Sequence, residues 1–304
     1  MADRYVLVSP CFNEETVIAK FLTSIEEKLA SSNRLFTVIV VDDCSSDSTV
    51  EILKNFRFRS ANFELKLISL KYNVGHQNAI YQGLCYAQQF EAKGYIVLDS
   101  DGEDDPDAIK QLIEIPKFDI VFVSRGKRKE SWKFKLGYFF YKLLFKIICG
   151  NNINFGNYSM VNSRVLFAIC NQRYFHYSAF LSKMRFSKQY IQFDRQKRID
   201  GKSKMNYNNL IYHGLKSLIE YSEEVLSFFL KLFFFLVIVT VFIIGSILYK
   251  KLISHEAIEG WASTLTGIFF NSLLTIIGIV VLSLYLLSLK GKTNVNDNIR
   301  DEIK

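Results

Sequence analysis

Two long stretches without a charged residue constrain this chain more than any other feature. Residues 232–249 form an uncharged run of 18 residues, and residues 262–289 form one of 28. A helix of about 20 apolar residues is long enough to cross the hydrocarbon core of a bilayer. We therefore expect two membrane-spanning helices, at about 228–249 and 264–289, joined by a short turn into a hairpin.

The average composition hides this uneven distribution. The chain is 49% hydrophobic, which excludes the composition of disordered proteins, and its 15 Gly and 3 Pro exclude a collagen-like or low-complexity chain. Five cysteines without paired spacing predict neither disulfides nor a zinc site, and we expect buried, reduced thiols. The sequence therefore predicts a folded head over residues 1–224, a transmembrane hairpin over 225–289 and a tail over 290–304.

Basic residues are concentrated in two segments of the head. Residues 125–150 contain eight Lys or Arg and one Glu, and residues 183–204 contain eight Lys or Arg and two Asp. Beside a membrane anchor, such patches favour anionic lipid or a phosphorylated substrate over nucleic acid. The first ten residues hold too short an apolar stretch for a signal peptide. We expect the head and the tail to be cytoplasmic, although Lys250 and Lys251 in the turn weaken the charge contrast.

The first 124 residues alternate short β-rich runs with longer helical stretches. This alternation predicts an α/β fold, with a parallel sheet covered by helices. Continuous apolar runs predict strands buried on both faces at 5–9, 37–41, 65–69, 95–98 and 120–123. We expect helices at 15–30, 47–55, 76–92 and 107–115. Ser48 and Glu51 have the spacing of a capping box, which predicts a helix start there.

Residues 132–148 interleave aromatic and aliphatic side chains with lysines. Lys135, Lys142 and Lys146 are seven and four residues apart, so they share one face of a helix. Such an amphipathic helix can lie in the membrane interface, with its lysines at the level of the lipid headgroups. An ordinary helix packed on the sheet fits the pattern equally well. Between this helix and another at 207–224 we expect a less regular region, at 151–204.

Polar residues gather after the predicted strands, at the edge where open α/β sheets bind ligands. Residues 10–15 follow the first strand, 42–48 the second and 99–106 the fourth. Asp99 and Asp101 can face one pocket, and their mutual repulsion favours a bound cation. Hard oxygen ligands select Mg²⁺ or Mn²⁺, which bind phosphate oxygens. A lone Asp-x-Asp is common and by itself favours a solvated acidic loop, but four polar loops in strand order favour a site.

These loops resemble those of the family 2 glycosyltransferases, which have the GT-A (Rossmann-like) nucleotide-sugar-binding fold. Within the family the chain resembles the polyprenyl-phosphate sugar transferases, including dolichol-phosphate mannose synthase and bacterial glucosyltransferases. The motifs cover roughly residues 5–205, and the tail matches by architecture. The matching residues are Pro10 with Asn13 and Glu14, Asp42-Asp43 with Ser45 and Asp47, Asn73-x-Gly75, and Asp99-x-Asp101-x-Glu103, where Glu103 replaces the usual Gln.

The resemblance implies roles for these residues. It implies Mg²⁺ or Mn²⁺ bound by Asp99, Asp101 and Glu103. It implies a UDP- or GDP-sugar bound by Pro10, Asn13, Glu14, Asp42, Asp43, Asn73, Gly75, Asp99 and Ser203. Arg125 and Arg128 match an arginine pair that faces phosphate in relatives, and Arg198, Ser203 and Lys204 match an Arg-x-x-Gly-x-Ser-Lys motif.

Catalysis is implied for Asp101, Arg125, Arg128, Arg198 and Lys204. Guanidinium and ammonium groups can neutralise both an acceptor phosphate and a leaving diphosphate. Each basic residue, taken alone, is better explained as a solvated surface charge. Their positions within the motifs favour the functional role.

One segment departs from the family pattern. Residues 156–159 read Gly-Asn-Tyr-Ser, where many relatives have Gly-Asp-Phe/Tyr-Arg with Asp as a candidate base. Asn157 cannot take a proton. A phosphate monoester, with a second pKa of about 6, is largely a dianion at neutral pH and needs no base, whereas a sugar hydroxyl normally needs one. The departure fits a lipid-phosphate acceptor but leaves open an altered acceptor or lost activity.

The resemblance therefore implies a membrane-bound, metal-dependent, inverting glycosyltransferase that moves a sugar from a nucleotide diphosphate sugar to a polyprenyl phosphate on the cytoplasmic face. One alternative is transfer to a hydroxyl of a lipid-linked glycan, with Asp104 or Asp105 as the base. A second is a non-catalytic membrane module that binds nucleotide sugar or lipid. Membrane lipids are expected partners and nucleic acid is not, while apolar helix faces near the membrane permit a homo-oligomer.

Overall fold

The computed structural model describes residues 2–115, 117–125, 143, 145–147, 150, 155–193, 215–249, 252–253, 260–289 and 299–303. The chain divides into two compact units. The first unit contains Met1–Leu136, Ile153–Ser217 and Lys292–Lys304, and the second contains Gly137–Asn152 and Leu218–Gly291.

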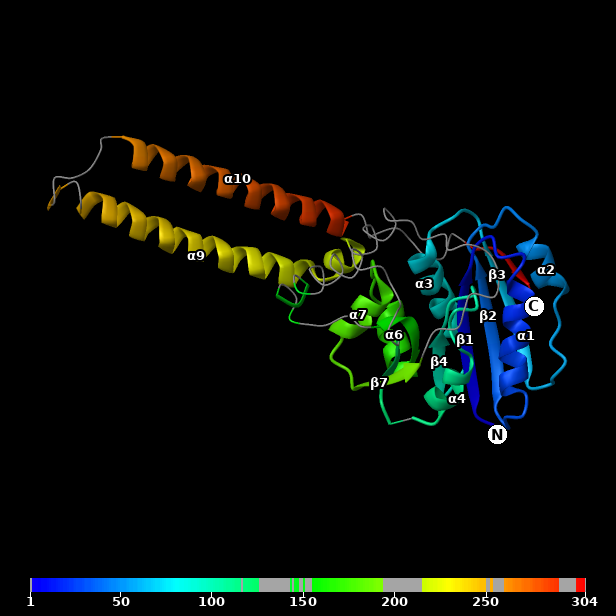
Figure 1. Ribbon diagram of the computed structural model, residues 1–304. Coiled ribbons are helices and arrows are strands. Elements are labelled where there is room, and N and C mark those ends of the chain that lie inside the picture. The colour runs from blue at the N-terminus through cyan, green and yellow to red at the C-terminus, as the bar shows by residue number, and fades with distance from the viewer. Residues whose placement is uncertain are drawn as a thin grey trace. The chain divides into compact units, whose positions relative to one another are not determined.

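The first unit is built around a mixed sheet of eight strands in the order β7-β5-β6-β4-β1-β2-β3-β8 (Figure 1). The strands are β1 (Arg4–Cys11), β2 (Leu35–Asp42), β3 (Phe63–Leu70), β4 (Gly94–Val97), β5 (Ile120–Arg125), β6 (Phe155–Val161), β7 (Lys188–Phe193) and β8 (Ile299–Ile303). The strands β3, β2, β1 and β4 are parallel neighbours. The five strands predicted from continuous apolar runs are confirmed as β1 to β5.

Helices cover both faces of this sheet (Figure 1). They are α1 (Ile18–Leu29), α2 (Thr49–Asn55), α3 (His76–Ala87), α4 (Asp107–Ile113), α6 (Ser163–Cys170) and α7 (Tyr177–Lys183). One hydrophobic core contains residues of α1, α2 and α4, and the other contains residues of α3, α6 and α7. Alternate strand residues divide between the two cores: Leu7 lies in one, and Val6 and Val8 lie in the other. Both faces of the central strands are therefore buried.

The capping box predicted at the start of α2 does not form. Ser48 is the N-cap residue, but its side chain makes no capping hydrogen bond. Its backbone N–H donates to Glu15 Oε2 at 3.0 Å, and the N–H of Thr49 donates to Asp47 Oδ1 at 3.0 Å. The predicted position of the helix start is right, but its caps come from residues outside the box.

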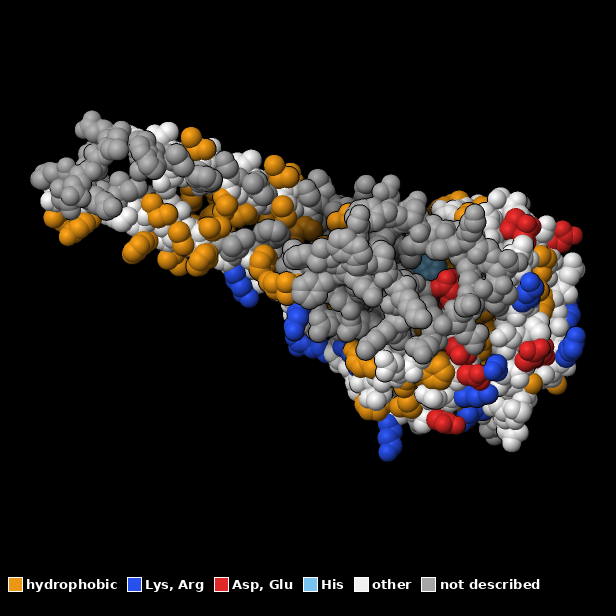
Figure 2. Space-filling model, in the orientation of Figure 1, with side chains coloured by type: hydrophobic (Ala, Val, Ile, Leu, Met, Phe, Trp, Pro, Cys, Tyr) orange, Lys and Arg blue, Asp and Glu red, His pale blue; other side chains and the backbone are white. Residues whose placement is uncertain are grey.

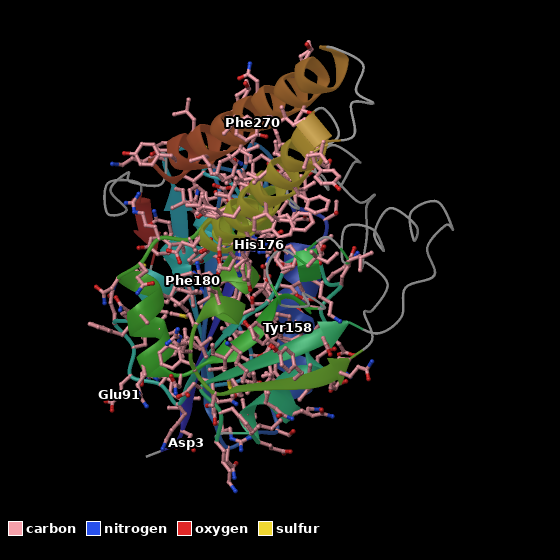
Figure 3. The ribbon with its side chains drawn as sticks, turned by 90° about the vertical axis from the view of Figure 1, so that its left-hand side faces the viewer. Asp3, Glu91, Tyr158, His176, Phe180 and Phe270 are labelled. Atoms are coloured by element: carbon pink, nitrogen blue, oxygen red, sulfur yellow. The ribbon has the colours of Figure 1, made fainter. Side chains whose placement is uncertain are left out.

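The expectation of a less regular region at 151–204 is wrong for residues 155–193. β6 runs antiparallel between β4 and β5, and β7 pairs with β5 in parallel. The connecting helices are held by aromatic packing, in which the rings of Tyr174 and Phe180 stack with centroids 5.4 Å apart. Figure 3 labels Phe180 on α7 and Tyr158 on β6, both of which are buried. This segment therefore completes the sheet beside β4.

The C-terminal tail contains a strand that the sequence analysis did not predict. β8 pairs with β3 in antiparallel register, with Leu67 opposite Ile303 and Leu70 opposite Ile299. Edge strands pair through backbone groups, so the sequence of β8, Ile-Arg-Asp-Glu-Ile, needs no apolar run. The chain therefore returns to the sheet after its last long helix.

Two long apolar helices form the second unit, α9 (Ser222–Tyr249) and α10 (Trp261–Leu289), and they lie side by side (Figure 1). By length and composition, Ser222–Ile243 is the one segment of the described chain that could cross a membrane. The apolar stretch of α10, Thr266–Leu282, is shorter. Hydrophobic side chains are exposed along these helices, including Phe234 and Phe242 of α9 (Figure 2).

Most of the predicted interfacial helix, at 132–148, lies outside the described residues. Leu143 and residues 145–147 are helical, and the ring of Phe145 packs edge-on against Tyr221 with centroids 5.1 Å apart. Of the predicted helix at 207–224, residues 215–220 are helical and 207–214 are not described.

The described cysteines are free thiols, as predicted, but only Cys11 is buried. Cys44, Cys85 and Cys170 are half-buried. The expectation of burial is therefore wrong for these three, and Cys149 is not described.

Candidate active site

Four loops meet at one edge of the sheet, because parallel strands place their carboxyl ends together. The loops follow β1, β2, β3 and β4. β6 runs the opposite way, so Asn157, near its start, also lies at this edge, close to the end of β4. Arg125 is the last residue of β5. The sheet therefore brings together most of the predicted motifs.

The first loop is fastened to the second by short hydrogen bonds. Asn13 has a left-handed backbone, with a φ of 53°, and its N–H donates to Ser45 Oγ at 2.8 Å. Its side-chain oxygen accepts from the N–H of Ser46 at 2.8 Å. The N–H of Glu14 donates to Thr49 Oγ1 at 2.9 Å. Asn13 therefore connects the two loops through hydrogen bonds from its backbone and its side chain.

The two carboxylates at the end of β2 have different surroundings. Asp42 is 1% exposed, and its Oδ2 accepts from the N–H of Ser45 at 3.2 Å. Among the described residues nothing hydrogen-bonds to its buried Oδ1. Asp43 instead uses both oxygens to accept from the N–H groups of Val74 and Gly75, at 2.7 and 2.9 Å. Asp42 therefore retains an acceptor for a ligand, whereas Asp43 holds the third loop.

The third loop leads directly into α3. Asn73 donates from Nδ2 to the carbonyl oxygen of Asp43 at 3.1 Å. Gly75 has a φ of 84°, a backbone conformation that residues other than glycine rarely adopt. It immediately precedes the first residue of α3. The Asn73 and Gly75 pattern therefore shapes the start of the helix.

A stability prediction follows from the contacts of Asp43. Burial raises the pKa of this carboxyl to about 6, although the two N–H groups oppose the shift. An unfolded Asp titrates near 3.9, so the folded chain holds the proton more tightly, and the stabilisation from this group is lost as the pH rises from about 4 through about 6. We expect Asp43→Ala to lower the free energy of unfolding, and to lower it by about 1 kcal/mol more at pH 5 than at pH 7.

Chemical denaturation in detergent, monitored by circular dichroism at pH 5 and at pH 7, measures the two free energies of unfolding. Asp3→Ala is the control, because Asp3 is exposed and its carboxylate makes a loose ion pair with Lys93, at 3.9 Å. A loss of stability for Asp43→Ala that does not change with pH would contradict the assignment.

The loop after β4 carries the predicted metal ligands. Asp101 Oδ1 accepts from the N–H of Glu103 at 3.0 Å, which fixes the orientation of the Asp101 carboxylate. Asp104 is buried, and its Oδ2 accepts from the N–H of Asp99 at 2.9 Å. Asp105 Oδ1 accepts from the N–H of Asp107 at 2.9 Å. Asp104 and Asp105 therefore shape the loop.

His76 and Asn157 complete the neighbourhood of Asp99. His76 Nε2 lies 3.2 Å from Asp99 Oδ1 and 2.9 Å from Asn157 Nδ2. Burial would lower the pKa of His76, but the contact with Asp99 and the charges of Asp99, Asp101 and Asp104 together outweigh this effect and raise the pKa above its ordinary value. The sequence analysis did not assign a role to His76, although the residue follows the Asn73-x-Gly75 motif.

The residues at this edge of the sheet fit a divalent ion whose coordination is completed by oxygen atoms of a bound substrate. In the described part of the chain no three His, Cys, Asp or Glu side chains lie close enough together to hold a metal ion by themselves. Mg²⁺ and similar ions are commonly held by one or two carboxylates, with phosphate oxygens and water as the other ligands. Asp99, paired with His76, and Asp101, oriented by the next turn, suit that mode.

The predicted phosphate-binding residues are described only in part. For Arg125 the structure gives the backbone position at the end of β5. Arg128, Arg198, Ser203 and Lys204 lie outside the described residues. The backbone of Pro10 takes part in the site, because its carbonyl oxygen accepts from Ser100 Oγ at 2.8 Å.

The mixed sheet, with helices on both faces and carboxylates at its ligand-binding edge, defines a nucleotide-binding α/β protein of the GT-A type. The chain belongs to glycosyl transferase family 2, whose family model matches residues 6–199. It is thus a glycosyltransferase by family, as the motifs predicted.

Relatives and solved structures agree with this assignment. The chain is 25% identical over 298 residues to the uncharacterized glycosyltransferase YkcC of Bacillus subtilis (strain 168), covering 91% of this chain and 87% of the relative. It is 31% identical over 130 residues to the undecaprenyl-phosphate 4-deoxy-4-formamido-L-arabinose transferase of Pseudomonas savastanoi pv. phaseolicola, covering 42% and 37%. Glucosyl-3-phosphoglycerate synthase from Mycobacterium tuberculosis, solved with Mn²⁺, UDP-glucose and phosphoglyceric acid, has a similar fold: TM-score 0.53, 12% identity, coverage 73% and 80%.

Proposed function

We propose that this protein is a membrane-bound inverting glycosyltransferase that moves a sugar from a nucleotide diphosphate sugar to a polyprenyl phosphate at the cytoplasmic membrane face. The observation that carries the proposal is the placement of Asp42, Asp99 and Asp101 at the ligand-binding edge of a family 2 sheet. The same chain contains a helix long and apolar enough to cross a membrane.

The buried Asp42 supports nucleotide binding. Its Oδ1, which the described residues leave without a hydrogen bond, would accept one from the base or ribose. Pro10 lies near the end of β1 and Glu14 follows that strand, and both would contact the same nucleotide. Ser203, which lies outside the described residues, stays a predicted contact. Asn13, Asp43, Asn73 and Gly75 would act on the donor indirectly, by holding the loops in place. The bound donor is a UDP- or GDP-sugar.

The carboxylates after β4 support divalent-metal dependence. Asp99 and Asp101, with Glu103 beside them, would hold Mg²⁺ or Mn²⁺ against the donor diphosphate. The solved glycosyltransferase from Mycobacterium tuberculosis, which contains both Mn²⁺ and UDP-glucose, is consistent with this role. A bound ion supplies positive charge that stabilises the departing diphosphate.

A lipid phosphate suits the acceptor side of the site. Asn157 cannot serve as a base, and a phosphate monoester does not need one at neutral pH. Asp104 and Asp105, the candidate bases for a hydroxyl acceptor, each accept a backbone N–H of their own loop. The undecaprenyl-phosphate transferase among the relatives also supports a polyprenyl phosphate. The hydroxyl acceptor is therefore less well supported.

The reaction is a single displacement. An oxygen of the acceptor phosphate forms a bond to the anomeric carbon, while the bond from that carbon to the diphosphate oxygen breaks and the nucleoside diphosphate leaves with the electron pair. Attack from the opposite face inverts the anomeric configuration. Arg125, Arg128, Arg198 and Lys204 would neutralise the two phosphate groups and align them.

The topology of the chain supports a two-span anchor. α10 has 29 residues, which makes it long enough to cross a bilayer. After α10, strand β8 pairs with β3 of the head. A chain that leaves the head and returns to it crosses the membrane an even number of times. We therefore retain the hairpin over 225–289, the head over 1–224 and the cytoplasmic tail over 290–304.

A donor panel tests the proposed function. Membranes that contain the protein are incubated with polyprenyl phosphate, Mn²⁺ or Mg²⁺, and labelled UDP-, GDP- or dTDP-sugars. We expect one donor to give a lipid-extractable product, and chelation of the metal with EDTA to abolish it. Binding of donors without turnover anywhere in the panel would contradict the proposal and favour the non-catalytic module.

A further inference from the structure

The contacts of His76 bear on whether its ring nitrogen Nε2 carries a proton. This atom lies 3.2 Å from Asp99 Oδ1 and 2.9 Å from Asn157 Nδ2. An imidazole nitrogen either donates through a proton or accepts through a lone pair, but never both at once. Asp99 can only accept and an amide nitrogen can only donate, so the two neighbours demand opposite states of Nε2.

A series of hydrogen bonds through two amide side chains determines which group Asn157 presents to Nε2. The series begins at a backbone N–H, which can only donate. The N–H of Tyr177, the first residue of α7, can only donate, and the side-chain atom 2.6 Å from it is Gln77 Oε1. Gln77 therefore presents Nε2 to its other neighbour, Asn157 Oδ1, at 3.4 Å. Asn157 in turn must present its own Nδ2 to His76. Gln77 is 4% exposed, so the protein interior holds this orientation.

Asn157 therefore favours the form of His76 in which Nε2 accepts and the ring proton resides on Nδ1, whereas the charge of Asp99 favours a proton on Nε2. A cation bound by Asp99 would offset that charge and take the place of the proton on Nε2. A neighbouring hydrogen bond commonly selects the tautomer of a metal-binding histidine in this way. The lone pair of Nε2 and the carboxylate oxygen of Asp99 then lie 3.2 Å apart. A cation between them satisfies both atoms.

The separation of the two atoms suits adjacent ligands of one ion. In octahedral coordination, ligands about 2.1 Å from the metal and at right angles to each other are about 3 Å apart. Imidazole nitrogen is a better ligand for transition-metal ions than for Mg²⁺, which prefers oxygen. The pair of one nitrogen and one oxygen atom therefore discriminates between the two ions proposed above.

We propose that His76 is a metal ligand together with Asp99, and that its Nε2 makes the site prefer Mn²⁺ to Mg²⁺. Gln77 and Asn157 are positioning residues that hold this nitrogen in its ligand tautomer. The inference rests on the proposed function, because it places the ion in the proposed donor site.

Electron spin echo spectroscopy of Mn²⁺ bound to the full-length protein in detergent, without a histidine tag, tests the proposal directly. A coordinated imidazole gives nitrogen-14 modulation of the Mn²⁺ signal. We expect wild type to show this modulation and His76→Gln to lose it, with Mn²⁺ binding weakened at least about tenfold and Mg²⁺ binding changed far less. In His76→Gln, the new amide oxygen can still accept from Asn157, so the fold should persist.

His176→Asn is the matched control. His176 Nδ1 accepts from the N–H of Ala179 as the cap of α7, and Asn is also a good cap. This variant should keep the modulation. Bound Mn²⁺ without modulation in wild type, or with modulation intact in His76→Gln, overturns the proposal. Sugar transfer without modulation would leave the proposed function standing, whereas modulation without transfer to any acceptor would refute the function alone.

Discussion

Asp101→Asn is expected to reduce metal-dependent sugar transfer to polyprenyl phosphate by at least about a hundredfold. Removal of one group that stabilises charge in a transition state typically costs 10²–10³ in rate. The variant keeps an oxygen that can accept from the N–H of Glu103, so the turn at residues 101–103 should be preserved. The expected loss therefore reflects the missing negative charge toward the metal. Initial rates at saturating donor, measured in membranes, give the effect.

Asp107→Asn provides the control for Asp101→Asn, because it removes the same charge a few residues away. Asp107 begins α4 and pairs with Lys28 and Lys110, at 2.5 and 2.9 Å. Surface ion pairs of this kind contribute little, so we expect a rate within about twofold of wild type. Equal losses in the two variants, or an unchanged rate in Asp101→Asn, would contradict the assignment of Asp101 to the metal site.

Gly83→Ala is expected to destabilise the head by about 2 kcal/mol, although alanine is the better helix former. Gly83 lies in α3 where the helix packs against β1 and β2. A Cβ atom there would lie 2.5 Å from Val8 Cγ1 and 2.7 Å from Val41 Cγ2. Both atoms belong to stiff, branched side chains of buried strands, so the helix must move away. Thermal unfolding in detergent measures the loss.

Gly94→Ala is the matched control for Gly83→Ala, since it adds the same methyl group at another close contact. The nearest atom to a Cβ at position 94 is Met160 Sδ, at 2.8 Å. Methionine is flexible and can yield, so we expect a clearly smaller loss of stability. Equal losses at the two positions would show that the close approach of α3 to the sheet is not what requires Gly83.

Much of the fold follows from the sequence where strands are buried on both faces. The runs that became β1 to β5 are continuous and apolar, and the helices between them are amphipathic. β6 reads Phe-Gly-Asn-Tyr-Ser-Met-Val and β8 reads Ile-Arg-Asp-Glu-Ile, so neither has such a run. Both strands are antiparallel to their neighbours and are selected by tertiary pairing, which a local pattern does not reveal.

In the candidate site, too, some features follow from the sequence and others depend on tertiary packing. The order of the strands predicts that the loops after β2 and β4 share one edge, and it places Asp42, Asp99 and Asp101 there. The sequence does not reveal that Asp43 holds the third loop. Nor does it bring His76 to Asp99, because that contact depends on how closely α3 packs on the sheet at Gly83. Motifs therefore predict the place of the chemistry, and packing determines which atoms meet.

The acceptor of the sugar is the central claim, and a comparison of acceptors tests it most directly. Membranes containing the protein, metal and the active labelled donor are given polyprenyl phosphate, the corresponding polyprenol without phosphate, or a lipid-linked glycan. Mass spectrometry of the lipid extract identifies the product. We predict one sugar joined to polyprenyl phosphate and no product from the polyprenol. A product formed only on the lipid-linked glycan would contradict the account.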